Sequence, residues 1–192
     1  SSFRVFGDAY VEASYGEDIL PEPKDEIGQG FLSLERVAIQ VNAHMLIRLG
    51  WLLGGGYQDL LSVLMPRLLN GDSHYVSDHN VGAPVQQWFV IKVLIAMVQQ
   101  ILCGAENWGV FHIRSADTCS EAEFADNLVR LLSQELGREI SMPEVAAKGD
   151  DRHAFPGGAQ LDGSRCTDDF GIQLPSWRTG LKTLIHNYVD RD

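Results

Sequence analysis

Two short apolar runs constrain the fold of this chain more than any other feature. His44 to Leu49 reads HMLIRL, a continuous apolar run with one Arg, and Gly109 to Arg114 reads GVFHIR. That pattern is typical of strands buried inside a parallel sheet. Between them, Tyr57–Leu69 and Gln87–Cys103 carry apolar residues at helical spacing. Strands that alternate with helices predict an α/β architecture with parallel pairing.

Other segments carry weaker signals. We expect a strand at Phe3–Phe6, a helix at Gly28–Asn42 that follows an acidic, proline-containing loop, and a break in regular structure at Leu52–Gly56. The Gln87–Cys103 run is strongly apolar but contains Lys92 and three Gln, so we expect a buried helix and not a membrane span. A final amphipathic helix is expected from Pro175 or Ser176 to the end of the chain.

Charge and hydropathy exclude several classes of partner. The chain has 192 residues, 26 of them acidic and 15 basic, which gives a net charge of −11. Nucleic acid and anionic membranes both require a basic surface, so neither is expected as the main partner. No apolar run reaches the roughly 18 residues of a membrane span. At 45% hydrophobic residues the chain can form a core as a single domain or one large subdomain.

The cysteines, and the residues with which the chain begins, bear on its cellular context. Cys103, Cys119 and Cys166 are widely spaced and odd in number, which predicts structural thiols in a reducing cytoplasm. The chain does not begin with Met, and it opens on what looks like a strand already in progress. We therefore expect it to be part of a longer protein.

Common catalytic and cofactor motifs are absent from the sequence. No G-x-G-x-x-G follows a predicted strand, and GGGYQDLL at Gly54 has the wrong spacing, so the chain lacks a dinucleotide-phosphate fingerprint. Neither a Walker motif nor H-E-x-x-H or G-x-S-x-G occurs, and the histidines have no metal-ligand spacing. The charged loop around Arg152 has two open interpretations, a solvated loop or a contact from Arg152 to a phosphate or sugar.

Six segments, taken in order, resemble motifs of the dTDP-4-dehydrorhamnose reductase (RmlD-like) family of extended short-chain dehydrogenases/reductases. They cover nearly the whole chain and are SSFRVFGD from Ser1, the stretch from Tyr15-x-Glu17 to Glu35, LIRLGWLLGG from Leu46, VSDHNVGAP from Val76, GVFHI followed by Cys119–Phe124, and LDGSRCTDDFGIQLPSWRTGL from Leu161. The resemblance implies a partial Rossmann-like NAD(P)-binding fold plus the small C-terminal α/β substrate-binding subdomain. The implied boundaries are 1–56 and 85–114 for the remnant of the Rossmann-like core, 57–84 and 115–175 for the substrate-binding subdomain, and 176–192 for a C-terminal helix.

The resemblance also implies where a catalytic centre would lie. Such reductases use a Ser or Thr, a Tyr and a Lys, in which the Tyr transfers a proton and the Lys lowers the pKa of the Tyr and holds the nicotinamide ribose. Ser2 takes the hydroxyl position, whereas Ile27 and Phe31 take the Tyr and Lys positions. No Tyr-x-x-x-Lys occurs anywhere in the chain. Neither Ile nor Phe can donate a proton or carry charge, so the pair is expected to be inactive.

Two further residues are assigned by the same resemblance. Trp51 falls where the family places an aromatic residue in its sugar-nucleotide pocket, and both a binding role and a core role remain open. Arg48 follows the family's Arg on the same strand, where we expect a structural ion pair.

Two functions of different classes are consistent with these features. The first is sugar-nucleotide binding in a reductase-related protein, with NAD(P)-dependent reduction of a dTDP-4-keto-6-deoxysugar implied by the family but not carried out by this chain alone. The second is a non-catalytic binding or regulatory relative, similar to the regulatory subunit of methionine adenosyltransferase. NADP or NAD is implied only by resemblance, and none is expected to bind this chain alone. Expected partners are a nucleotide sugar and either a second copy or a complementing N-terminal segment.

Overall fold

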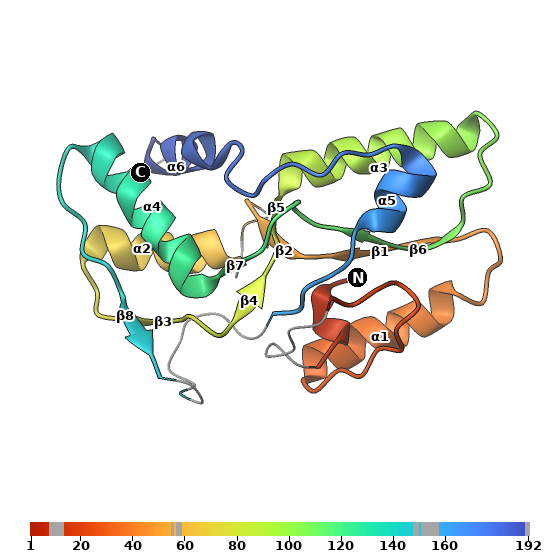
Figure 1. Ribbon diagram of the computed structural model, residues 1–192, viewed down its shortest axis with the longest axis horizontal. Coiled ribbons are helices and arrows are strands. Elements are labelled where there is room, and N and C mark those ends of the chain that lie inside the picture. The colour runs from red at the N-terminus through yellow and green to blue at the C-terminus, as the bar shows by residue number, and fades with distance from the viewer. Residues whose placement is uncertain (8–13, 55, 57–58, 148–149, 151–157, 191–192) are drawn as a thin grey trace.

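Parallel strands with helices on both faces form one half of the molecule. The computed structural model describes residues 1–7, 14–54, 56, 59–147, 150 and 158–190 (Figure 1). Strand β1 (Met45–Leu49) pairs in parallel with β6 (Gly109–Ile113), with Met45 opposite Gly109 and Leu49 opposite Ile113. Ser2 forms a parallel bridge to Leu49. The two apolar runs therefore form the parallel strands that the sequence predicts, with five of their ten residues buried and five partly buried.

Three helices cover this parallel pair. Helix α1 (Glu26–Ala38) lies on one face, and α3 (Gln87–Leu102) and α5 (Ser164–Phe170) lie on the other (Figure 1). On the side of the sheet that α3 and α5 cover, a compact apolar cluster is buried against the strands. Its members are Val85, Val90, Val93, Met97, Phe111, Ile113, Cys166 and Phe170. This arrangement confirms the α/β fold.

The other half of the molecule contains α2 (Leu60–Asn70), α4 (Glu121–Leu136) and α6 (Leu181–Val189). These helices share a larger apolar cluster that includes Leu64, Phe124 and Trp177. Their strands are β3 (Tyr75–Ser77), parallel to β8 (Glu144–Ala146), and β4 (Val81–Gly82), antiparallel to β7 (Cys119–Ser120). The parallel pair of β2 (Trp51–Leu53) and β5 (Pro84–Gln86) lies between the halves (Figure 1). The residue boundaries implied for the two units stay a prediction.

Helix ends follow local chemistry where the sequence offers it. Ser120 caps the start of α4, and its hydroxyl accepts a hydrogen bond from the Glu123 amide at 3.0 Å. Gly137 ends α4 with a φ of 61° and Gly71 ends α2 with a φ of 73°. Both lie in the left-handed region that glycine adopts without a Cβ penalty.

Four local expectations were wrong. The final helix, expected from Pro175 or Ser176, begins at Leu181. Phe3–Phe6 is not a strand, because Phe3–Val5 forms a single 3₁₀ turn (η1) that is capped by the Ser2 hydroxyl. The helix expected to reach Asn42 ends at Ala38. The break expected at Leu52–Gly56 begins inside strand β2, since Leu52 pairs with Val85.

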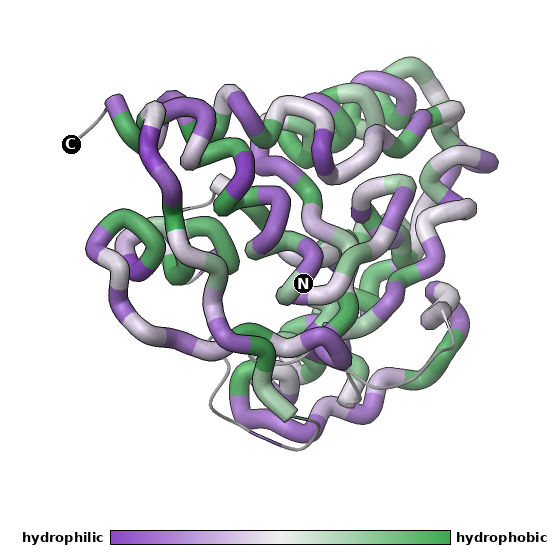
Figure 2. Tube along the Cα trace, turned by 60° about the vertical axis from the view of Figure 1, so that its left-hand side comes forward, coloured by the Kyte–Doolittle hydropathy of each residue, from purple (hydrophilic) through white to green (hydrophobic). Residues whose placement is uncertain are grey.

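The apolar helix α3 is a helix as predicted, but the expectation of a buried helix holds for one face only. Val90, Val93 and Met97 face the core, whereas a series of large apolar side chains on another face is exposed. Figure 2 shows hydrophobic and hydrophilic residues interleaved along the helices of the molecule. None of the described helices is both long and apolar enough to cross a membrane. The three cysteines are free thiols.

Candidate functional site

The chain segment from Ser1 to Phe6 brings the expected catalytic hydroxyl to the edge of β1. The Ser1 amino group donates to the Ile47 carbonyl at 2.8 Å, and the Leu49 amide donates to the Ser1 carbonyl at 3.4 Å. The Ser2 hydroxyl accepts from the Arg4 amide at 3.3 Å. Ser2 therefore lies near the carboxyl end of β1, the edge at which open parallel sheets bind their ligands.

The start of α1 is held tightly against this segment. Asp25 caps the helix by accepting from the Gly28 amide at 2.6 Å and pairs with the Arg4 guanidinium at 2.8 Å. Burial alone would raise the pKa of Asp25, but these hydrogen bonds hold it below its usual value. A Cβ on Gly28 would lie 2.2 Å from the Arg4 carbonyl oxygen, so only glycine allows this approach.

Ile27 and Phe31 lie one helical turn apart on this first part of α1. Ile27 is half exposed, and Phe31 is partly buried against the larger apolar cluster. Both side chains are hydrocarbon and can neither transfer a proton nor hold a ribose hydroxyl. Their correspondence to the Tyr and Lys positions rests on the sequence resemblance and stays a prediction.

Trp51 lies inside the core, with 1% of its surface exposed. A Cβ on Gly82 would lie 2.2 Å from its ring, so strand β4 packs directly on the indole. This burial favours the core role over the binding role, although a role in binding stays a prediction. Arg152 lies outside the described residues.

A buried ion pair joins α1 to β1. The Arg48 guanidinium donates to Glu35 in a two-point contact, at 3.0 Å to Oε1 and 2.8 Å to Oε2, and both residues are 4% exposed. The Ser1 hydroxyl adds a 2.5 Å hydrogen bond to Oε1. Burial alone would raise the pKa of Glu35, but the hydrogen bonds and the charge of Arg48 lower it overall. The structural ion pair expected for Arg48 is confirmed.

His112 extends this pair into a cluster. Its Nδ1 lies 3.0 Å from the Asp162 carbonyl oxygen and its Nε2 lies 3.4 Å from Arg48 Nη1. The carbonyl can only accept, so Nδ1 carries the proton and neutral Nε2 faces the cation. Burial and the Arg48 charge lower the pKa of His112 to about 4. The Glu17 carboxylate accepts from the His112 amide at 3.2 Å, and burial raises the pKa of Glu17.

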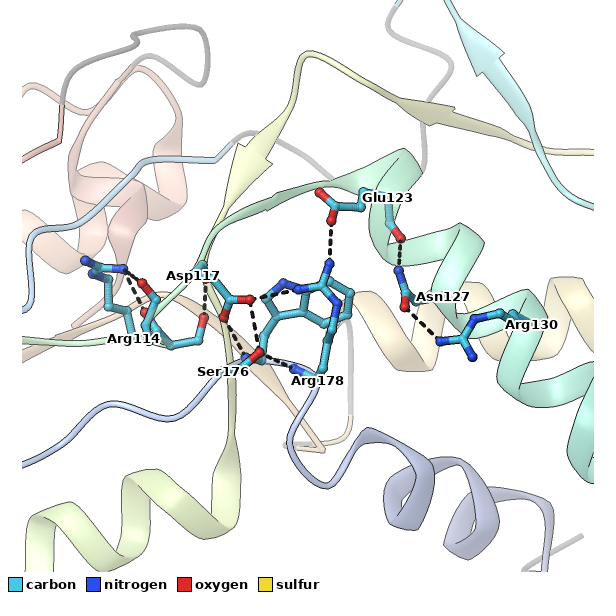
Figure 3. A network of polar contacts seen from close by, with 10 residues as sticks. Arg114, Asp117, Glu123, Asn127, Arg130, Ser176 and Arg178 are labelled. Carbon is cyan, nitrogen blue, oxygen red and sulfur yellow. Dashed lines mark hydrogen bonds and ion pairs between the residues drawn. The ribbon is translucent and has the colours of Figure 1, made fainter.

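A second polar network fixes the C-terminal segment (Figure 3). The Asp117 carboxylate accepts from the Ser176 hydroxyl at 3.0 Å, the Trp177 amide at 3.0 Å and the Arg178 guanidinium at 2.8 Å. Arg178 also pairs with Glu123 at 2.5 Å and lies 4.1 Å above the Trp177 ring. One carboxylate thus accepts hydrogen bonds from three donors in a segment that follows it by about 60 residues. These bonds hold the residues that precede α6 against the residues that precede β7.

Two clefts open near the carboxyl ends of parallel segments. The first, the Phe6 cleft, measures about 410 Å³ and is lined by Phe6, Gly7, Tyr15, Ile19, Leu20, Glu22 and Lys24. Phe6 and Tyr15 stack with their ring centroids 4.5 Å apart. The first residue that lines the cleft, Phe6, comes four residues after Ser2 in the chain. The lining combines aromatic side chains with one cation, Lys24, and one carboxylate, Glu22.

The second cleft, the Gln86 cleft, measures about 430 Å³ and lies where β2 and β5 end and α3 begins. Its polar lining comes from Gln86, Gln87, Trp88, Thr183 and Asn187, and none of its described lining residues is charged. Within the described part of the chain, no group of three His, Cys, Asp or Glu side chains could hold a metal ion.

Residues 1–189, nearly the whole sequence, match the family model of the RmlD substrate binding domain. The chain belongs to this family.

Its relatives are longer proteins. The dTDP-4-dehydrorhamnose reductase of Sinorhizobium fredii is 22% identical over 175 residues, which cover 89% of this chain and 59% of the relative. A crystal structure of the dTDP-4-dehydrorhamnose reductase ortholog from Clostridium acetobutylicum superimposes with a TM-score of 0.80 at 21% identity, over 98% of this chain and 64% of that one. The Bacillus anthracis reductase, solved with NADP, gives 0.70 at 19% identity over 97% and 62%. These structures show the fold, and the chain spans about three fifths of each protein.

The cluster around Arg48 and His112 joins residues from several of the segments that resemble the family. Glu17, Glu35, Arg48, His112 and Asp162 each belong to one of the six segments that resemble RmlD-like motifs, and they lie far apart in the sequence. In the fold they meet around one guanidinium and one imidazole. The separate motifs do not predict this convergence, apart from the ion pair at Arg48. The matched positions thus include those that hold α1, β1 and β6 together.

Proposed function

We propose that this RmlD substrate binding domain binds a nucleotide sugar and does not by itself carry out the reductase reaction. The observation that carries the proposal is the match to the family over residues 1–189, together with Ile27 and Phe31 at the expected Tyr and Lys positions. A carbonyl reduction requires a proton donor beside the substrate oxygen. Two hydrocarbon side chains supply none, whereas binding requires only the pocket.

The Phe6 cleft supports the binding half of the proposal. Tyr15, which stacks on the buried Phe6, offers an aromatic surface for a base or sugar ring, and Lys24 supplies a cation for a diphosphate. The cleft also lies next to the segment that carries Ser2, the expected catalytic hydroxyl. The Gln86 cleft is neutral and offers no cation to a diphosphate, so we assign the nucleotide sugar to the Phe6 cleft.

Cofactor and partners follow from the same reasoning. The sequence holds no Gly-rich turn for a dinucleotide diphosphate, so its residues do not fit NADP or NAD, and neither is expected to bind this chain alone. A complementing N-terminal segment would have to supply that turn. The second candidate function, a non-catalytic regulatory relative, is favoured by the same Ile27 and Phe31, and it differs in requiring a protein partner instead of a sugar nucleotide.

Ligand binding is expected to stabilise the chain. A dTDP-sugar at about 100 times its Kd stabilises the folded state by roughly 2.7 kcal/mol, which raises the Tm by roughly 5–10 °C for a chain of this size. Thermal unfolding with increasing dTDP-glucose measures this shift. Lys24→Met is expected to reduce the shift, and Asn187→Ala in the Gln86 cleft serves as the matched control and keeps it. If millimolar dTDP-glucose leaves the Tm unchanged, the regulatory function is favoured instead.

Turnover is expected to be absent. The purified chain, incubated with NADPH and a dTDP-4-keto-6-deoxysugar, should consume no cofactor, because no side chain at positions 27 and 31 can protonate the product oxygen. The measurement is the loss of NADPH absorbance against a blank that lacks protein. A rate of cofactor oxidation above that blank, together with a lower rate in the Ser2→Ala variant, would show that the chain is an active reductase.

A further inference from the structure

One buried amide holds the walls of the Gln86 cleft in place. Gln86 is the last residue of β5, it is 4% exposed, and its Oε1 accepts a hydrogen bond from the Trp88 indole at 2.5 Å. Its Nε2 donates to the Thr179 carbonyl, shortly before α6 begins. A Cβ on Gly180 would lie 3.0 Å from Gln86 Oε1, so the start of α6 packs closely on this amide. The side chain of one strand residue thus joins the starts of two helices, and the cleft between them is preorganised.

Three side chains that line this cleft have polar groups available to a ligand. Gln87 is the first residue of α3, whereas Thr183 and Asn187 belong to α6, where their spacing of four residues places them on one face. All three are exposed, and within the described part of the chain their side chains form no hydrogen bond. Each can both donate and accept, and none carries a charge. The cleft therefore presents uncharged donors and acceptors from two helices.

These groups favour an uncharged ligand that carries several hydroxyls. A hydroxyl both donates and accepts, so it can pair with an amide or a hydroxyl of the cleft in either direction. An anion would require a cation, but none of the described lining residues is charged, and the net charge of −11 repels anions. Lys92, whose ammonium lies 4.8 Å from the centre of the Trp88 ring, does not line the cleft. A purely apolar ligand would take the polar side chains out of water without giving them partners.

The rest of the lining is apolar and aromatic. It includes Leu53, Leu184 and the Trp88 ring, which is 39% exposed. A sugar ring packs its C–H groups on such surfaces while the hydroxyls around its rim reach polar side chains. At about 430 Å³ the cleft has room for one such ring. We propose that the Gln86 cleft binds an uncharged sugar ring as a second ligand, separate from the nucleotide sugar, since the two clefts share no lining residue.

Fluorescence titration of the whole chain with D-glucose tests this site. Trp88 lines the cleft, whereas Trp51 and Trp177 are 1% exposed and do not line it. Glucose is expected to change the emission of Trp88 along a saturable curve, with a Kd on the order of 1–10 mM, the range that ligand efficiencies give for a ring of about a dozen non-hydrogen atoms. Glucose 6-phosphate is expected to bind more weakly, because its phosphate finds no cation in the cleft. Trp88→Phe should remove the change in emission.

Two variants test whether the polar side chains contribute to binding. Asn187→Ala and Thr183→Val are each expected to weaken glucose binding about tenfold, because each removes a hydrogen-bonding group that faces the ligand. Both residues are exposed, so the fold should tolerate the changes, and an unchanged Tm without sugar checks this. The matched control is Asn70→Ala at the end of α2, where an equally exposed asparagine lies outside the cleft. This control should bind glucose as the unmodified chain does.

Four results would overturn the proposal. They are an emission that does not change at glucose concentrations far above the expected Kd, a change that persists in Trp88→Phe, equal affinity in both Asn187→Ala and Thr183→Val, and tighter binding of glucose 6-phosphate than of glucose. The titration contains no nucleotide, so its failure would leave the assignment of the nucleotide sugar to the Phe6 cleft untouched. Conversely, Asn187→Ala should lose affinity for glucose while it keeps the Tm shift with dTDP-glucose, which separates the two clefts.

Discussion

Replacing Glu35 with alanine is expected to lower the free energy of unfolding by about 3–5 kcal/mol, because the change leaves the buried charge of Arg48 without its partner. Arg48 is 4% exposed and cannot turn its guanidinium to water without opening the contact between α1 and β1. The Ser1 hydroxyl, which donates to Glu35, loses its acceptor as well. The expected loss is a large fraction of the stability of an ordinary domain.

Urea unfolding of the variant and the unmodified chain measures this loss. The matched control is Asp169→Ala, which removes the partner of Arg165 from an ion pair whose side chains are both about one third exposed. Such a pair contributes at most about 1 kcal/mol. Equal losses for the two variants would contradict the role assigned to the buried cluster.

A double substitution separates the attraction of the pair from the cost of its burial. Glu35→Leu with Arg48→Met replaces both charges by apolar side chains, and in other proteins such replacements are close to neutral or stabilising. The double variant is therefore expected to be more stable than Glu35→Ala alone. If it is less stable, the hydrogen bonds of the cluster contribute more than its charges cost.

The sequence predicts the elements whose environment is uniform along their length. HMLIRL and GVFHI are short, mainly apolar runs, and they form the parallel strands β1 and β6 with helices on both sides of the sheet. The α3 sequence is apolar almost all round, and that pattern alone does not distinguish a helix buried on every side from one that leaves a face exposed. Phe3–Phe6 also has a strand pattern, but the Ser2 hydroxyl accepts from the Arg4 amide and turns the chain.

The candidate site was predictable only in part. That Ile27 and Phe31 take the Tyr and Lys positions is a prediction from the sequence motifs, whereas the ion pair of Arg48 was expected and is confirmed. Glu17 and His112 were not expected to meet, because 95 residues separate them and no local pattern encodes their contact. Long-range polar contacts depend on which strands become neighbours, and this information belongs to the topology.

His112 is expected to make the chain sensitive to mild acid. In the unfolded chain a histidine takes up its proton near pH 6.5, whereas the folded chain holds the pKa of His112 at about 4. Between these values the unfolded state binds more protons, so stability falls as the pH is lowered from 6.5 to 4 and is fully present above 6.5. The difference corresponds to about 3 kcal/mol.

Urea unfolding across this pH range, compared with His112→Gln, isolates the effect. The raised pKa of Glu17 makes its contribution to stability change with pH in the direction opposite to that of His112. The lowered pKa of Glu35 reduces stability only at pH values below the usual pKa range of a glutamate. Both residues remain in the variant. The variant should therefore show a much smaller loss between pH 6.5 and 4, even if it is less stable at neutral pH. Equal slopes for the two proteins would mean that the imidazole accepts its proton in the folded state. Arg48, with Nη1 at 3.4 Å from Nε2, would then have to move away from the new charge.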